Sequence, residues 1–189
     1  MLNALQKKEL LKIARSVLLE YFSKGTVPKI KVNSPELKAS GGAFVTLQKK
    51  GQLRGCIGLI ESDNPLYQNV RDMAIEAATQ DPRFMPVTEA ELAEIEIEIS
   101  ALSVKHRIKS IDEIELGTHG VIVKQGFARG VFLPQVATET GWNKIEFMRN
   151  LCAGKAGLKA DAYLDPKTEM FVFTAEVFSE KEFKEYPPI

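Results

Sequence analysis

The 189-residue chain has few of the residues that build metal sites and disulfide frameworks: it contains two cysteines and two histidines. Cys56 and Cys152 lie far apart and form no CxxC pair, so the sequence predicts no zinc site and no disulfide framework, while a single bridge between the two stays open. No dinucleotide-binding glycine loop, Walker lysine loop, GxSxG elbow, HExxH or calcium loop occurs. We therefore expect no bound metal and no cofactor.

Charge of one sign and long apolar runs are also lacking. Twenty-five Lys and Arg balance 25 Asp and Glu, and balanced charge favours neither nucleic acid nor an anionic membrane as a partner. The aromatic residues are scattered, without the basic-aromatic interleaving of an RNA-binding sheet. The N-terminal segment mixes Glu and Lys with its apolar residues, unlike a signal peptide or a membrane span. We expect a cytoplasmic protein with no nucleic-acid and no membrane partner.

The chain does contain enough apolar sequence for a full core. Hydrophobic residues make up 44% of it and charged residues 26%, which is ordinary for a globular protein. Apolar residues recur at helical spacing in segments 10–22, 66–78 and 144–157, and Gly25 supplies a stop for the first helix. The segment 26–42, rich in proline and glycine, predicts a long irregular connection, and such loops are often functional.

Strand patterns alternate with these helices and favour hairpins. Segments 43–60 and 119–133 each hold two β-rich runs around a glycine turn, and the alternation of Glu and Ile in 94–100 predicts a half-exposed strand. A last strand is predicted over 169–179, followed by a docked or frayed tail, KEYPPI, at 184–189. This order predicts an α+β fold with a mainly antiparallel sheet flanked by helices.

The stretch QLRGCIGLI, residues 52–60, puts an arginine, a cysteine and two glycines inside a predicted strand. Because side chains alternate along a strand, Arg54 and Cys56 are predicted to share a face. A nearby guanidinium favours the thiolate, so Cys56 is a candidate nucleophile and Arg54 its activator or an anion holder. Gly55 and Gly58 would leave room for a ligand. The alternative is an inert, buried Cys56 in a strand whose glycines accept a tightly packed helix.

Helpers for Cys56 must come from other segments. Of the two histidines, His119 lies between glycines in GTHG, where it is a candidate base or ligand contact, with a structural turn residue as the alternative. In DPRF, Arg83 either pairs with Asp81 or binds a carboxylate or phosphate. The candidate substrate-binding side chains that could line one anion pocket are Arg54, Arg83, Arg129 and Gln135.

Five motifs in order resemble the AMMECR-domain family: LRGCIG at 53–58, DPRF at 81–84, GTHGV at 117–121, FLPQVATETGW at 132–142 and LCAGKAGL at 151–158. The resemblance covers most of the chain. It implies a two-lobed α+β fold with the LRGCIG strand near a cleft between the lobes. We expect residues 1–189 to form one such domain, with a larger, sheet-containing lobe and a smaller lobe around 25–90. The resemblance also implies Memo-like and radical-SAM proteins as partners, and it brings no established reaction.

Three hypotheses for the function follow. The leading one is an enzyme or enzyme subunit acting on a small anionic or carbonyl-bearing substrate, with Cys56 as nucleophile or acid/base, Arg54 as activator or anion holder, and His119 assisting. The second is a binding or regulatory module whose glycine-rich strand docks a peptide, a small molecule or a partner of the radical-SAM system. The third is a purely structural role for the strand. Residues alone do not decide whether the protein is an enzyme.

Overall fold

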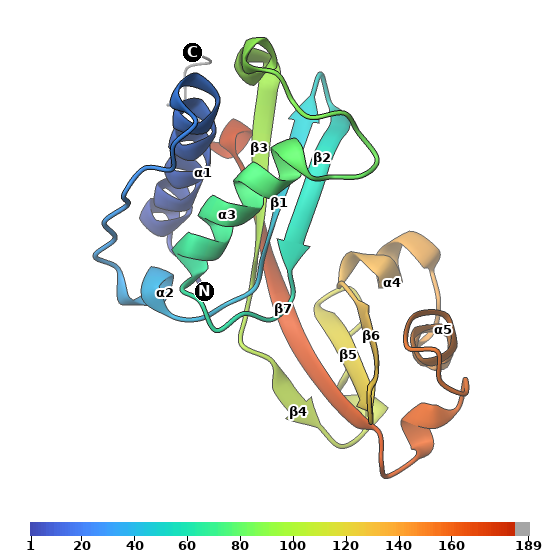
Figure 1. Cartoon of the computed structure of the whole chain (residues 1–189). Coiled ribbons are helices and arrows are strands. Elements are labelled where there is room, and N and C mark those ends of the chain that lie inside the picture. The colour runs from blue at the N-terminus through green and yellow to red at the C-terminus, as the bar shows by residue number, and fades with distance from the viewer. Residues whose placement is uncertain (184–189) are drawn as a thin grey trace. The chain divides into compact units, whose positions relative to one another are not determined.

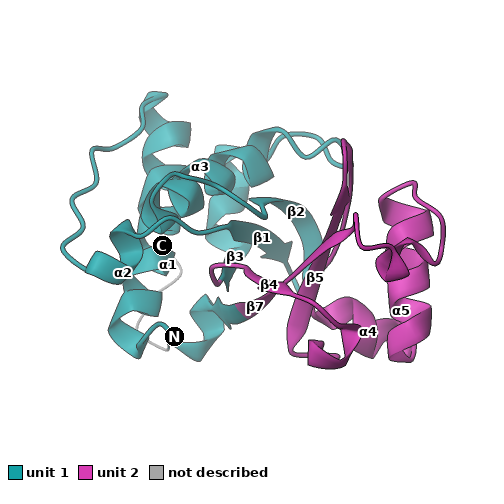
Figure 2. Ribbon diagram, turned by 90° about the horizontal axis from the view of Figure 1, so that it is seen from below, with its two compact units in different colours: residues 1–102, 176–189 teal, residues 103–175 magenta. Residues whose placement is uncertain are grey.

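The apolar patterns fold into two compact units that share one strand (Figures 1 and 2). The structure is a computed structural model that describes residues 1–183, so the predicted tail at 184–189 lies outside the described residues. Unit 1 comprises residues 1–102 and the chain from 176 onward, and unit 2 comprises residues 103–175. Residues 25–90, predicted as the smaller lobe, lie within unit 1, because they supply two strands and a helix to its sheet and core.

The predicted α+β class and the antiparallel strand pairing are confirmed. The helices are α1 (Ala4–Lys24), α2 (Pro35–Lys38), α3 (Leu66–Thr79), α4 (Gln135–Thr140) and α5 (Lys144–Asn150). The strands are β1 (Ala43–Lys49), β2 (Gln52–Leu59), β3 (Ile95–Leu102), β4 (His106–Ile108), β5 (His119–Gln125), β6 (Ala128–Phe132) and β7 (Glu169–Ser179). No helix within residues 1–183 combines the length and the apolar content needed to cross a membrane.

In unit 1, β1 pairs with β2 on one side and with β3 on the other, and helices α1 and α3 lie on the same face of these strands (Figure 1). Alternate side chains of β1 and β3 point to that face and join the helices in one core; they include Val45, Leu47, Ile97 and Ile99. The residues between them, such as Thr46 and Glu98, therefore take the opposite face.

The two long helices of unit 1 end where the sequence predicts; α3 also begins there, whereas α1 begins at Ala4, before the predicted segment 10–22. A capping box formed by Asn3 and Gln6 opens α1, and Gly25 closes it in the left-handed conformation. Pro65 precedes α3, which ends at Thr79, shortly before Asp81-Pro82. The first helix thus needs no correction beyond its earlier start.

In unit 2, β5 pairs with β6 and β7, and β4 pairs with β7. Helix α5 packs its buried Phe147 and Met148 against this sheet, and Cys152 is also fully buried. The predicted helix over 144–157 is only partly regular, because a π turn follows α5 over residues 151–155. The widened turn lies against β6, where a side chain on Gly130 would meet the Ala156 main-chain nitrogen at 2.7 Å.

Candidate functional site

Strand β2 lies at the edge of the unit 1 sheet, and its register against β1 slips at Arg54. Leu47 pairs with Gly55, whereas the next residue of β1, Gln48, pairs with Leu53, so Arg54 is an extra residue. A bulge of this kind interrupts the alternation of side chains. The prediction that Arg54 and Cys56 share a face assumed an unbroken strand, and the bulge removes that basis.

The Arg54 guanidinium is engaged by the chain segment that follows α3. Its Nε and Nη2 donate to the two carboxylate oxygens of Glu91 at 3.1 and 3.0 Å, and its Nη1 donates to the Met85 carbonyl oxygen at 2.9 Å. Arg54 and the Thr88 main-chain N–H together lower the pKa of Glu91 to about 2. These contacts tie β2 to residues 85–91, while the predicted roles of Arg54 toward Cys56 or an anion stay predictions.

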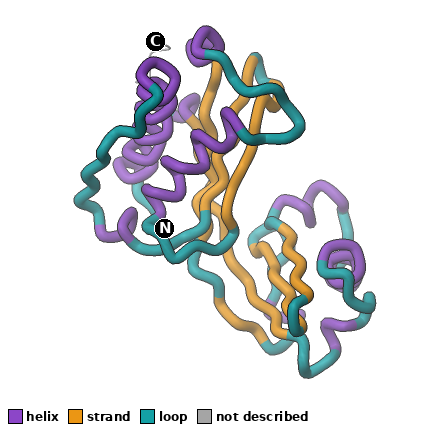
Figure 3. Tube along the Cα trace, viewed as in Figure 1, coloured by secondary structure: helices purple, strands orange, loops and turns teal. Residues whose placement is uncertain are grey.

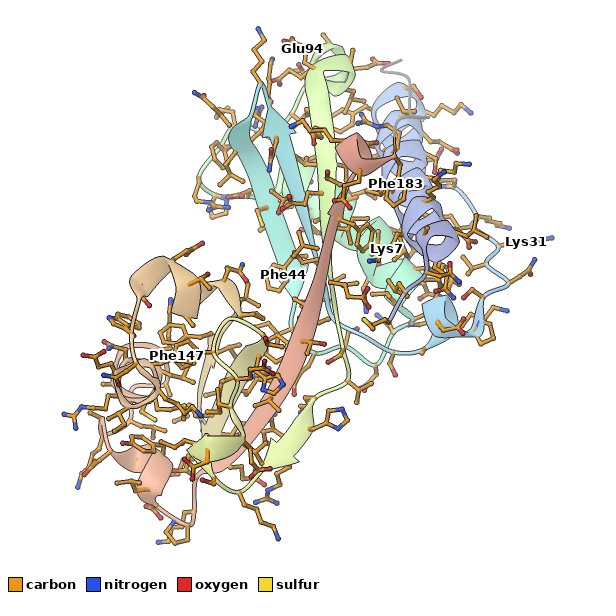
Figure 4. The ribbon with its side chains drawn as sticks, turned by 180° about the vertical axis from the view of Figure 1, so that it is seen from behind. Lys7, Lys31, Phe44, Glu94, Phe147 and Phe183 are labelled. Atoms are coloured by element: carbon orange, nitrogen blue, oxygen red, sulfur yellow. The ribbon has the colours of Figure 1, made fainter. Side chains whose placement is uncertain are left out.

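Close packing accounts for the two glycines of β2, because neither position has room for a side chain. A Cβ on Gly55 would lie 2.1 Å from the Ala77 carbonyl oxygen, and one on Gly58 would lie 2.3 Å from the ring of Phe44. Phe44 is labelled in Figure 4. Atoms of the protein therefore fill the room that the sequence assigned to a ligand beside each glycine. Gly55 permits helix α3 to pack tightly against the strand, as the alternative interpretation of the sequence proposed. A substrate-binding role for the two glycines stays a prediction that this geometry does not favour.

The main chain of Cys56 is held at the sheet edge by the DPRF segment. The Cys56 N–H donates to Asp81 Oδ2 at 2.8 Å, and its carbonyl oxygen accepts from Arg83 Nη2 at 3.4 Å. Arg83 also donates from Nε and Nη2 to the two Asp81 carboxylate oxygens at 2.9 and 2.7 Å, so the predicted Arg83–Asp81 pair is confirmed. These two side chains take the place of a neighbouring strand and cap the edge.

Asp81 and Arg83 differ in how much solvent they meet. The Asp81 side chain is 2% exposed and the Arg83 side chain 54% exposed. The hydrogen bonds from Arg83, followed by that from the Cys56 N–H, hold the pKa of Asp81 well below its usual range. Asp81 is thus a fixed buried anion, and the outer part of the Arg83 guanidinium faces solvent next to Cys56.

On the sheet face opposite α1 and α3, Cys56, Thr46 and Glu98 form a row across three strands. Thr46 of β1 is the register partner both of Cys56 on β2 and of Glu98 on β3. The Thr46 hydroxyl donates to Cys56 Sγ at 3.1 Å, and all three residues are half-buried. Neighbouring Cβ atoms in such pairs lie about 4.5–5.5 Å apart, so Thr46 lies directly beside both Cys56 and Glu98.

Glu98 holds its proton to a higher pH than an ordinary glutamate. Burial raises its pKa, and the negative charges of Glu96 and Glu182 raise it further, against a smaller opposite effect of Lys181. A carboxyl with a raised pKa is a better candidate for a general acid than an ordinary glutamate. The row therefore combines a thiol, a hydroxyl and a carboxyl whose pKa is raised.

The other predicted site residues belong to unit 2. His119 Nδ1 accepts a hydrogen bond from the Glu115 main-chain N–H at 3.1 Å. The main-chain N–H of His119 donates to the Glu115 carbonyl oxygen at 2.8 Å, and the two bonds close the turn before β5. Arg129 pairs in register with Lys124 across the β5–β6 hairpin, and Gln135 is the first residue of α4. These contacts favour the structural alternative for His119, and its convergence with Cys56 stays a prediction.

Sequence reasoning missed Thr46 and Glu98. The Glu-Ile alternation of β3 does place Glu98 on the polar face, but which strand lies beside β1 depends on long-range pairing. Both cysteines are free. Within residues 1–183, no group of three or more His, Cys, Asp or Glu side chains is arranged to hold a metal ion.

Comparison with known proteins gives the family. The model of the AMMECR1 family matches residues 11–178. The chain belongs to the AMMECR1 family. The family prediction is thereby confirmed, and the LRGCIG strand that holds Cys56 lies within the matched residues.

Relatives of this AMMECR1-family protein occur in archaea. It is 42% identical over 180 residues to a protein of Methanothermobacter thermautotrophicus, covering 92% of this chain and 93% of that protein. It is 40% identical over 182 residues to a protein of Methanopyrus kandleri, covering 92% of this chain and 87% of that protein. A crystal structure of an uncharacterized protein from Pyrococcus horikoshii matches with a TM-score of 0.77 at 37% identity, covering 95% of this chain and 91% of that one.

Proposed function

We propose that this AMMECR1-family protein is an enzyme, or an enzyme subunit, whose Cys56 thiol reacts with a small anionic, carbonyl-bearing substrate. The observation that carries the proposal is the row of Cys56, Thr46 and Glu98 on one sheet face. A nucleophile, a hydroxyl that orients it and a carboxyl that holds its proton are the groups that addition to a carbonyl requires.

The reaction step uses these groups in defined roles. The Cys56 sulfur forms a bond to the carbonyl carbon, the π electron pair of the carbonyl moves to its oxygen, and Glu98 gives that oxygen a proton. The thiol proton leaves to solvent, from which Glu98 takes up a proton again. Thr46, between the two, directs the sulfur through its hydrogen bond.

Arg83 is the side chain best suited to the anionic part of the substrate. Its side chain is 54% exposed, and its guanidinium donates to the Cys56 carbonyl oxygen. The hydrogen bond to Asp81 raises the pKa of Arg83, so the group stays charged. A carboxylate can bind to its outer edge through charge-assisted hydrogen bonds. The sequence offered four side chains for binding an anion: Arg54, Arg83, Arg129 and Gln135. The proposal gives this role to Arg83.

The probe for this proposal is glyoxylate labelled with carbon-13, because it joins an aldehyde and a carboxylate in one small molecule. Added to the whole chain, it should give the carbon resonance of a hemithioacetal. The Cys56→Ser variant should give none, and Cys152→Ala, which alters the buried cysteine of unit 2, should keep it. A hemithioacetal resonance of equal intensity in the Cys56→Ser variant would contradict the proposal.

A second candidate is the binding or regulatory module. The observation in its favour is that Leu53 and Leu59, on either side of Cys56 in the edge strand, are 43% and 39% exposed. Apolar side chains at a sheet edge suit a peptide or protein partner, and family resemblance names Memo-like and radical-SAM proteins as that class. Leu53→Asp with Leu59→Asp should abolish such binding, whereas Cys56→Ser should leave it unchanged.

A further inference from the structure

Residues 26–33, between α1 and α2, have the side-chain pattern of a β-strand although they pair with no strand in the described part of the chain (Figure 3). Exposed and covered side chains alternate along this segment: Val27, Lys29, Lys31 and Asn33 are exposed, whereas Pro28, Ile30 and Val32 are half-buried or buried. Ile30 and Val32 pack against the unit 1 core and so hold the segment on the surface. An alternation of period two is typical of extended backbone.

The main-chain groups of this segment are not used within the fold. No hydrogen bond described among residues 1–183 involves a main-chain N–H or C=O of residues 26–33. In extended backbone, the N–H and C=O of one residue point to the same edge, and those of the next residue to the other. One edge therefore carries the groups of Val27, Lys29, Lys31 and Asn33 with every donor present, while the other edge lacks a donor at Pro28.

The exposed side chains of the segment are cationic. Lys29 and Lys31 form no ion pair with any residue in the described range 1–183, and the Lys31 side chain extends outward from the fold (Figure 4). The nearest carboxylates along the chain, Glu20 and Glu36, accept hydrogen bonds from Thr26 and from Ser34 and Gln6. Lys29 and Lys31 are thus two positive charges without an ion-pair partner among residues 1–183, and both face the solvent beside main-chain groups that are not hydrogen-bonded.

We propose that residues 27–33 are a docking edge for an extended peptide segment of a partner protein that carries Asp or Glu at alternate positions. The peptide adds as a strand, so its main chain bonds to the Lys29 and Lys31 N–H and C=O groups, and its carboxylates lie opposite the two ammonium groups. A nucleic acid is less well matched, because it presents phosphates and no regular series of donors and acceptors for the main chain.

The first test reads the main chain directly. An alternating glutamate-threonine peptide is added to the isotope-labelled whole chain, and amide hydrogen exchange is followed by NMR. The exchange of the Lys29, Lys31 and Asn33 amides should slow at least about tenfold. The Ile30 and Val32 amides, which point to the other edge, should not change. Uniform protection of both sets, or protection of neither, overturns the proposal.

The second test measures affinity for the same peptide labelled with fluorescein. A block peptide of the same composition, with its glutamates contiguous, should bind at least about tenfold more weakly, and so should the alternating peptide to the variant with Lys29→Glu and Lys31→Glu. The matched control carries Lys12→Glu and Lys167→Glu, two exposed lysines elsewhere, and should bind as the unaltered chain does.

A third comparison separates main-chain pairing from charge. Lys31→Ala removes the charge and keeps the N–H, whereas Lys31→Pro removes both. Lys31→Pro should bind the alternating peptide at least about fivefold more weakly than Lys31→Ala. Equal affinity of these two variants contradicts strand addition. Tighter binding of a thymidine oligonucleotide than of the peptide, lost in the Lys29→Glu and Lys31→Glu variant, would assign the segment to nucleic acid and overturn the proposal.

Discussion

Gly55 lies where strand β2 packs against helix α3, and Gly58 lies next to the Phe44 ring. The obstacle to a side chain at Gly55 is the Ala77 carbonyl oxygen at 2.1 Å, which belongs to a helix main chain. At Gly58 the obstacles are the Phe44 ring at 2.3 Å and the Ala43 main-chain carbonyl oxygen at 2.6 Å. Both glycines should therefore tolerate alanine poorly.

Gly55→Ala should lower the free energy of unfolding by about 3 kcal/mol, because α3 must move away from the strand. Gly58→Ala should cost about 2–3 kcal/mol, because the Ala43 carbonyl oxygen of the neighbouring strand must move as well as the Phe44 ring. The control is Gly154→Ala, where no atom lies within 4 Å of the added carbon. Urea denaturation of the three variants measures these costs, and a Gly55→Ala or Gly58→Ala protein as stable as Gly154→Ala would contradict the packing.

Asp81 should contribute stability that depends on pH. Its folded pKa lies below the ordinary value of about 3.9, so the contribution is complete above that value and is lost as the pH falls below it. Asp81→Asn should reduce the free energy of unfolding by about 2 kcal/mol at pH 7, because the bonds to Arg83 and the Cys56 N–H weaken. The deficit should shrink when unfolding is measured near pH 3.

The control for that measurement is Asp63→Asn, which changes an exposed carboxylate of the same unit. It should alter stability by no more than about 0.5 kcal/mol at either pH. A deficit of Asp81→Asn that grows as the pH is lowered would mean that the Asp81 carboxylate does not stabilise the folded state.

At the scale of elements, the Arg54–Glu91 ion pair joins β2 to the 3₁₀ helix over residues 89–94. A double-mutant cycle with Arg54→Ala and Glu91→Ala should give a coupling energy of about 1–2 kcal/mol at pH 7, since the pair is bidentate and mostly shielded. Because the pKa of Glu91 is lowered to about 2, the coupling should fade as the pH drops from about 4.5 toward that value. A coupling that is unchanged at pH 3 would show that charge pairing is not its source.

Long elements could be predicted from the sequence because their patterns are local. The periodicities over α1, α3 and β3 each repeat several times within one segment, and one glycine turn marks each of the two hairpins. The short elements α2, α4 and β4 carry no such repeat and form because of what they pack against. The bulge at Arg54 and the π turn after α5 are likewise responses to neighbouring elements.

The candidate site likewise has residues that could be predicted from the sequence and residues that could not. Cys56 and the Arg83–Asp81 pair could be predicted because each motif is contiguous in sequence. Thr46 and Glu98 could not be predicted as neighbours of Cys56, since their contact depends on the register of three strands. The fit of the two glycines to Ala77 and Phe44 also depends on tertiary packing, so sequence alone left the ligand and the packing interpretations open.

At the scale of the whole molecule, the two cysteines should differ sharply in reactivity. Cys56 is half-buried on a polar sheet face, whereas Cys152 is fully buried and burial raises the pKa of its thiol. Iodoacetamide should therefore modify Cys56 at least about tenfold faster in the folded chain. Peptide mass spectrometry measures both rates, and denaturation in urea, as the control, should bring them close together. Equal rates in the folded chain would contradict the placement of Cys152 in the core.

The most direct test of a reactive Cys56 is the carbon-13 spectrum of labelled glyoxylate with the folded chain and with its Cys56→Ser variant. The row of Cys56, Thr46 and Glu98 predicts a hemithioacetal resonance with the unaltered chain and none with Cys56→Ser. Replacing Glu98 with Gln should slow its appearance, because the oxygen loses its proton donor. A resonance that persists in Cys56→Ser, or its absence from the unaltered chain, would contradict a catalytic Cys56.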